Sequence, residues 1–235
     1  MRSRVLLVAA CFCLVGSSAS ALSDKPYLTA ADVDFPALLP PPPTEASAAG
    51  ARDLQIALES QVRLTPAQMD EIQRDLDQSV YTVAGPVLGS VFTKDRFPLA
   101  GAFFVKVVQD AGVGVGPIKA QYKKARPFQF STRVQSPKNI ADAAQSPTYP
   151  SGHSSTGAAV ALLLGMMVPE QREALYARGW EYGFNRVRSG VAYPSDWEGG
   201  HILATLAVNQ MLKNPDFRAD FEAVKAEVRQ GLGLR

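Results

Sequence analysis

The sequence predicts an all-α protein: one helical domain that follows a leader and a proline-rich arm. Apolar residues recur at helical spacing almost throughout the chain after residue 49, beginning with Leu54, Leu58 and Val62. Capping residues and prolines stand where such helices would begin. We find no apolar/polar alternation bounded by turn residues, which is the pattern of a half-buried strand. These three observations favour a single-domain helical bundle over residues 48–235.

The N-terminus has the pattern of a secretory signal peptide. Residues 1–21 combine a basic start, a short apolar run and a small-residue Ala19-x-Ala21 site. Cys11 and Cys13, the two cysteines of the chain, both lie inside this leader. We therefore expect an exported protein, periplasmic or secreted, whose mature form has no disulfide and is stabilised by core packing.

The charge balance gives no argument for an anionic partner such as nucleic acid. Taking the two arginines of the leader from the 24 Lys and Arg leaves 22, which equals the 22 Asp and Glu. The mature chain is therefore close to neutral. Its apolar run at residues 160–168 is far shorter than the ~20 residues of a membrane span, so we expect no stable span after the leader.

Residues 22–47 form an arm with two open interpretations. Leu38 and Leu39 precede four prolines, Pro40 to Pro43, and such a run favours an extended polyproline conformation. The arm is either a linker or a strap whose leucines pack on the body or on a partner subunit.

The helices after the arm are delimited by caps and prolines. Thr65-Pro66 has the form of a capping box with proline at the first helical position, and Pro98 lies near the start of the next apolar helix. Arg126 precedes a proline, which disfavours helical backbone there. We expect helices over residues 65–80, 94–112, 118–125, 156–168, 169–188, 196–213 and from 215 onward.

Three of these boundaries carry further expectations. Ser151 is a good N-cap for the helix at 156–168, Ser195 is expected to cap the helix at 196–213, and Asn214-Pro215 opens the last one. Between the helices, residues 128–149 form a long polar loop, which in a compact domain usually has a function or is mobile.

The most informative stretch is Pro150-Ser151-Gly152-His153, a tight turn directly before an apolar helix. The first N–H groups of a helix are unpaired and the positive end of its dipole lies there, so this turn suits an anion. His153 would then be a proton donor beside that anion. Two other segments combine similar chemistry: Lys119 seven residues before Arg126-Pro127, and Arg186 ten residues before Asp196.

In this order the three segments resemble the signature of the type 2 phosphatidic acid phosphatase and vanadium haloperoxidase superfamily: K-x6-RP, then PSGH, then [S/N]-R-x5-H-x3-D. Lys25-Pro26-Tyr27-Leu28, the arm and the glycine-containing stretch 178–183 extend the resemblance to the class A bacterial non-specific acid phosphatases over essentially the whole mature chain. The resemblance implies an exported, all-α, metal-independent enzyme without cofactors, often dimeric, that hydrolyses phosphomonoesters through a phosphohistidine.

Roles follow from the resemblance residue by residue. The phosphate oxygens would be held by Lys119, Arg126, Arg186 and the backbone N–H groups of Ser151 and Gly152. His153 would protonate the leaving alkoxide, and Asp196 would orient the nucleophilic histidine. Arginine forks and fixed positive charge suit a phosphoryl group, whose transition state spreads charge over three oxygens.

The chain departs from the signature at the nucleophile. Six residues after Arg186, where the family has histidine, the sequence has Ala192. Tyr193 and Ser195 are poor substitutes without a base at hand. His201, five residues after Asp196, is about 140° away from it around a helix. We therefore expect phosphatase activity to be severely impaired in this sequence, whether the alanine is natural or engineered.

Several alternatives stay open. The chain is a phosphatase that binds phosphomonoesters, a non-catalytic binder of phosphate or phosphoesters, or a vanadate-dependent haloperoxidase, which also needs the missing histidine. Asp196 is alternatively a helix cap. Lys123, Lys124 and Arg133 are expected to form a solvated basic rim rather than to act as ligands.

Overall fold

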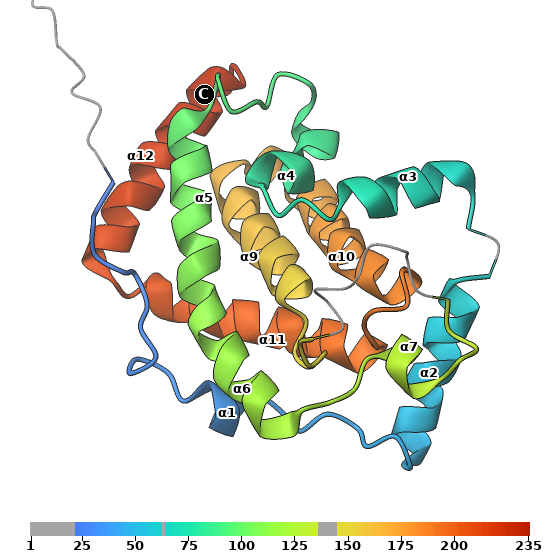
Figure 1. Cartoon of the computed structure of the whole chain (residues 1–235). Helices are drawn as coiled ribbons and strands as arrows, with labels where there is room; N and C mark the ends of the chain where they lie inside the picture. Colours follow the sequence, from blue (N-terminus) through green and yellow to red (C-terminus); the bar gives the residue numbers. More distant parts are fainter. Residues whose placement is uncertain (1–21, 63, 136–144) are drawn as a thin grey trace, which may run out of the picture.

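The computed structural model describes residues 22–62, 64–135 and 145–235, and within these ranges the chain is all-α, without a strand. Figure 1 shows α9 (Gly152–Met167) at the centre, between α5 (Pro98–Ala111) and α10 (Arg172–Arg188), with α11 (Pro194–Met211) crossing below and α12 (Pro215–Gly231) outside α5. The other elements are α1 (Phe35–Leu38), α2 (Ala48–Ser60), α3 (Pro66–Arg74), α4 (Val80–Leu88), η1 (Gly112–Gly114), α6 (Val115–Tyr122), α7 (Pro127–Phe130) and η2 (Pro169–Gln171).

The central helix α9 is buried nearly all round because its sequence is apolar on every face. It packs against α10 with the backbones very close together. A Cβ on Gly157 would lie 2.7 Å from the carbonyl oxygen of Gly179, and a Cβ on Gly179 would lie 2.6 Å from the carbonyl oxygen of Gly157. Only glycine permits this approach. It brings the N-terminal turn of α9 and the C-terminal half of α10 together, where the second and third sequence segments lie.

The prediction was right about two caps and wrong about two boundaries. Ser151 caps α9 and Asn214 caps α12, as expected. The helix expected over 65–80 ends at Arg74, and Ser79 caps a new helix, α4. The predicted Ser195 cap was also wrong: α11 begins at Pro194 with Tyr193 as its N-cap, because proline fits the first helical position.

Other helix limits differ by a few residues. The helix expected over 94–112 begins at Pro98, the one expected over 118–125 is α6, and η2 precedes α10 in the stretch 169–188. The short α7 lies inside the segment expected to be a loop. Residues 136–144 of that loop, like the proposed leader at 1–21, lie outside the described residues.

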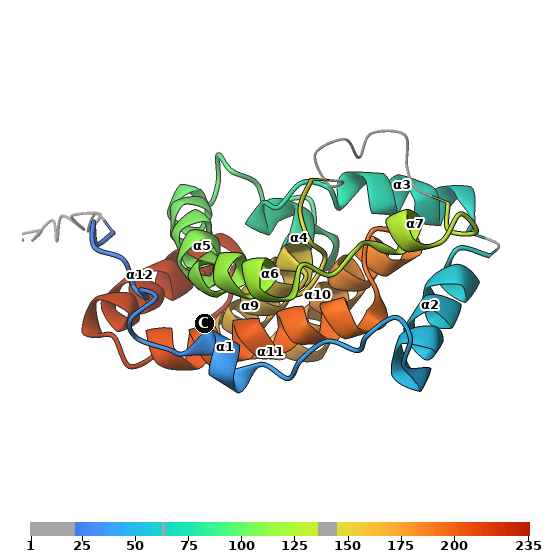
Figure 2. The same cartoon turned by 60° about the horizontal axis from the view of Figure 1, so that its bottom comes forward.

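The arm is a strap on the body of its own chain. Figures 1 and 2 show it running past α12, through α1 and along α11 to α2. The Tyr27 hydroxyl donates to Asp220 Oδ2 at 2.6 Å, and the Tyr27 backbone N–H donates to Asp110 Oδ2 at 2.7 Å. Leu39 is buried, whereas Leu38 remains 55% exposed. The strap interpretation is therefore confirmed, with one of the two leucines packed.

One stretch of the described chain, Pro98–Phe130, is apolar and long enough on composition to cross a membrane. In this fold it is divided among α5, η1, α6 and α7, and 39% of its apolar window is buried inside the protein. The longest of these helices, α5, has 14 residues and so measures ~21 Å, against ~30 Å of bilayer hydrocarbon.

Candidate active site

The turn before α9 presents unpaired backbone donors. Ser151 Oγ accepts from the Ser154 N–H at 3.3 Å, and the Ser151 N–H donates to the Asp196 carbonyl at 2.9 Å. Among the described residues, none accepts from the N–H groups of Gly152 and His153. A Cβ on Gly152 would meet nothing within 4 Å, so this side of the turn is open. The turn is therefore fixed to the start of α11 and leaves two donors for an anion.

Three cations, Lys119, Arg126 and Arg186, form a cluster around Arg126, and two of them also act on His153 in this turn. Burial, followed by the charge of Arg126, lowers the pKa of Lys119 to about 8. The same two causes lower the pKa of Arg186 to about 10. Burial also lowers the pKa of Arg126. These shifts require positive groups near one another in a poorly solvated place, so the structure brings the three predicted cations together.

Two of the cations are oriented by backbone carbonyls. Arg126 Nε donates to the Ser146 carbonyl at 2.9 Å, and its Nη1 donates to the Val191 carbonyl at 2.7 Å. Lys119 Nζ donates to the Pro147 carbonyl. By contrast, the Arg186 guanidinium has no hydrogen-bond or ion-pair partner in the part of the chain that the structure describes. Its planar fork of donors is thus available to a ligand.

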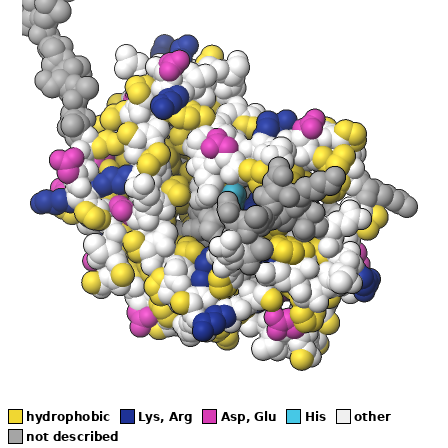
Figure 3. All heavy atoms as spheres, viewed as in Figure 1, with side chains coloured by type: hydrophobic (Ala, Val, Ile, Leu, Met, Phe, Trp, Pro, Cys, Tyr) yellow, Lys and Arg dark blue, Asp and Glu magenta, His cyan; other side chains and the backbone are white. Residues whose placement is uncertain are grey.

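His153 sits at the edge of this cluster as a neutral imidazole. Its ring stacks on Tyr182 with centroids 6.0 Å apart, and Nε2 lies 3.4 Å from the Leu76 carbonyl oxygen, which can only accept. Burial, then Arg186, and to a smaller extent Arg126 lower the pKa of His153 to about 3, while the Leu76 carbonyl opposes the shift. The space-filling view of Figure 3 shows one histidine at the surface near the middle of this face.

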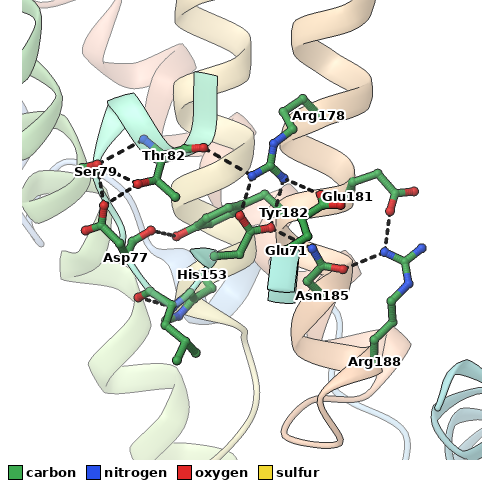
Figure 4. Close-up of polar contacts among 12 residues, drawn as sticks. Glu71, Asp77, Ser79, Thr82, His153, Arg178, Glu181, Tyr182, Asn185 and Arg188 are labelled. Carbon is green, nitrogen blue, oxygen red and sulfur yellow. Dashed lines mark hydrogen bonds and ion pairs between the residues drawn. The ribbon is translucent and has the colours of Figure 1, made fainter. Parts of the chain in front are cut away.

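The connector between α3 and α4, residues 75–79, holds His153 and Tyr182 in place (Figure 4). Asp75 accepts from Arg178 Nη1 at 3.0 Å and from Asn185 Nδ2 at 2.7 Å, which ties the connector to α10. Tyr182 OH donates to the Asp77 carbonyl at 2.9 Å. These bonds explain why the helix expected over 65–80 breaks: contacts with α10 outweigh local helix propensity.

Asp196 lies in the first turn of α11, four residues after Ala192. It is fully buried, and its Oδ2 accepts from Thr148 Oγ1 and from the Tyr193 N–H, both at 2.7 Å. The second bond makes Asp196 a cap of α11, as the alternative interpretation expected. Its Oδ1 accepts from Lys124 Nζ at 3.1 Å. Burial raises the pKa of Asp196, and Lys124 is the main opposing influence.

Comparison with known proteins identifies the family of the chain. The profile of the PAP2 superfamily matches residues 99–218, just over half of the chain. The chain belongs to the PAP2 superfamily. The matched range includes every site residue that the sequence predicted, from Lys119 to Asp196.

Related proteins cover most of the chain. The non-specific acid phosphatase of Providencia stuartii is 28% identical over 200 residues, 83% of this chain and 81% of that protein. The non-specific acid phosphatase of Salmonella typhi is 26% identical over 234 residues, 97% and 93% of the two chains. A solved structure, the transmembrane PAP2 type phosphatidylglycerolphosphate phosphatase of Bacillus subtilis, covers 72% of this chain and 87% of its own, with 17% identity and a TM-score of 0.49.

One buried cation of the candidate site, Lys124, was not predicted from the sequence. Lys124 was expected on a solvated rim, but it is 7% exposed and lies between Asp196 and Asp53, 3.5 Å from Asp53 Oδ2. The preceding residue, Lys123, ends α6 with φ 48°, in the left-handed region, and this turn directs the next side chain inward. Lys123 and Arg133 are exposed, as expected.

The other candidates for the nucleophile are accounted for. His201 Nδ1 lies 2.9 Å from the Trp197 carbonyl, and the ring is packed between Trp180 and Trp197, away from Asp196 as expected. Ser195 does have a base: its hydroxyl donates to Asp53 Oδ2, contrary to the sequence argument. However, the same Asp53 also accepts from the Ser195 N–H at 3.2 Å, which is the geometry of a helix cap.

Proposed function

We propose that this chain binds a phosphomonoester or inorganic phosphate in the manner of the class A acid phosphatases and retains their hydrolytic machinery except for the nucleophile. The observation that carries the proposal is the concentration of Lys119, Arg126 and Arg186 at the open N-terminal turn of α9. Buried cations that repel one another are costly without an anion. A phosphate dianion offsets that repulsion and accepts from the Arg186 fork, the lysine and the helix N–H groups, with Arg126 adding its positive charge beside them.

The same geometry assigns roles to the other groups. His153 lies next to the cations and would donate a proton to the leaving alkoxide once the bound anion raises its pKa. Asp196 would orient an imidazole at position 192, where the chain has a buried alanine. A methyl group cannot attack phosphorus, so turnover of phosphomonoesters should be very low.

The test compares turnover of p-nitrophenyl phosphate by the chain as written, with added imidazole, and as Ala192→His. Loss of a covalent nucleophile costs on the order of a million-fold in turnover. We expect Ala192→His to restore a metal-independent phosphatase that forms an acid-labile phosphohistidine, and imidazole to rescue part of the rate. Full activity in the unchanged protein would refute the nucleophile assignment.

Ala192 also favours the second candidate, a binder that does not turn over. No gain in Ala192→His, with phosphate binding intact, would support that function. A vanadate-dependent haloperoxidase is the weaker alternative, because it needs a histidine at the same position, and bromide oxidation with added vanadate tests it. Export follows from the leader-like residues 1–21, and a homodimer from the resemblance; fractionation and sedimentation test these two points.

A further inference from the structure

A cavity of about 290 Å³ opens beside the candidate phosphate site. One wall is the end of α5 and the start of α6, through Val108, Ala111 and Val115. The other wall is the first turn of α9, through Gly152, Ser155 and Thr156. Gln78 of the α3–α4 connector closes one side, and its Oε1 accepts from Thr156 Oγ1 at 3.1 Å.

The cavity adjoins two groups of the proposed phosphate site. Gly152 lines it, and His153 is the next residue on the same helical turn. On α6, Val115 and Gly116 line it, and Lys119 lies one turn further along the same face of that helix, at i+4 and i+3. A phosphate held between Lys119 and the first turn of α9 would therefore lie beside the cavity, next to the turn that carries His153.

The size and chemistry of the cavity limit what enters it. None of the described residues that line it is charged, so it offers nothing to balance a second phosphate or a carboxylate. An apolar cavity of about 150 Å³ is enough for one benzene ring, and this one is larger and polar on the Gln78 side.

We propose that this cavity is the leaving-group site and that it selects phosphomonoesters of uncharged alcohols or phenols about one ring in size. The inference rests on the proposed function, because it assumes that phosphate is held at Lys119, Arg126 and Arg186. Polyanionic esters, such as nucleoside polyphosphates, are then poor ligands, since their charge would enter an uncharged cavity.

The test uses binding, so it does not depend on turnover. Phenylphosphonate and methylphosphonate carry the same charged group, and only the first has a ring. We expect phenylphosphonate to bind about tenfold to a hundredfold more tightly by isothermal titration, the range for burying one aromatic ring. Val108→Phe fills the cavity and should abolish this preference while inorganic phosphate still binds. Gly116→Leu is a second filling variant, at a position where a Cβ meets nothing within 4 Å.

Val105→Phe is the matched control: it makes the same change on the exposed side of α5, where Val105 is 58% exposed, and should keep the preference. Equal binding of the two phosphonates by the unchanged protein overturns the leaving-group site and leaves the phosphate site standing. Loss of the preference in Val105→Phe as well would also overturn it. If neither the phosphonates nor phosphate bind, the proposed function itself fails.

Discussion

Replacing Lys124 with methionine tests how the buried carboxylate of Asp196 is stabilised. Lys124 Nζ lies 3.1 Å from Asp196 Oδ1, 3.5 Å from Asp53 Oδ2 and 2.9 Å from Ser195 Oγ, and all of these contacts are buried or nearly so. Without the ammonium, Asp196 is a fully buried carboxylate with two remaining hydrogen bonds and no counter-ion in contact. Removing one partner of a buried ion pair typically costs about 3–5 kcal/mol.

Protonation limits that cost and makes it depend on pH. An ordinary aspartate has a pKa of 3.8, so holding Asp196 protonated at pH 7 costs about 4.4 kcal/mol, at about 1.36 kcal/mol per unit of pH. At pH 5 the same step costs about 1.6 kcal/mol. Because burial already raises the pKa of Asp196, the folded state loses stability as the pH rises above the unfolded pKa. Removing Lys124 raises that pKa further and enlarges the loss of stability.

Urea denaturation at pH 7 and pH 5 measures both free energies of unfolding. We expect Lys124→Met to lose about 3–4 kcal/mol at pH 7 and less than half of that at pH 5. Lys123→Met is the control, because that side chain is exposed on the same turn, and should change stability by less than ~0.5 kcal/mol. A loss below ~1 kcal/mol at pH 7, or an equal loss at both pH values, would refute the argument.

Three further predictions concern the site and the strap. Phosphate should raise the pKa of His153 from about 3, because the anion offsets the charge of Arg186. An NMR titration of the histidine proton resonances measures this pKa, and an unchanged value would mean that phosphate binds elsewhere. Arg186→Ala should remove most of the phosphate-induced stabilisation, which is ~2.7 kcal/mol at a phosphate concentration of about 100 times the dissociation constant. Arg188→Ala should keep this stabilisation, because the Arg188 guanidinium binds Glu181 and Asn185 instead. Tyr27→Phe should cost about 1.5–3 kcal/mol of unfolding free energy by removing the bond to Asp220, and no change would show that the strap adds little to stability.

Local patterns predicted the parts of this structure that depend on neighbouring residues. The all-α class, the Ser151 and Asn214 caps and the central apolar helix follow from spacing, capping chemistry and hydropathy. The helix break at Asp75 did not follow, because its cause is Arg178, 103 residues away. Neither did the burial of Lys124, which depends on the left-handed backbone of Lys123 and on two acids, Asp53 and Asp196, in other helices.

The candidate site also contains some residues that the sequence could identify and others that it could not. The three cations and His153 could be chosen from motif order, and the structure places them close together, but their roles stay predictions until binding is measured. Asp53 and Thr148 could not be chosen, because an isolated aspartate or threonine carries no signal until Asp196 is seen to share its contacts.

The contacts of Asp196 explain why the site can hold together with alanine at position 192 and why histidine could still function there. Three groups donate to its carboxylate: the Thr148 hydroxyl, the Tyr193 backbone N–H and the Lys124 ammonium. None of them belongs to the side chain of residue 192, so an alanine at that position leaves the buried carboxylate with its partners. Each carboxylate oxygen offers about two acceptor positions. Oδ2 has two donors and Oδ1 has one, so one acceptor position remains for an imidazole N–H. The rescue by Ala192→His therefore does not require an existing bond to break. If that variant binds phosphate as tightly as the unchanged protein and still forms no phosphohistidine, this accounting of Asp196 is wrong and the site is organised for binding alone.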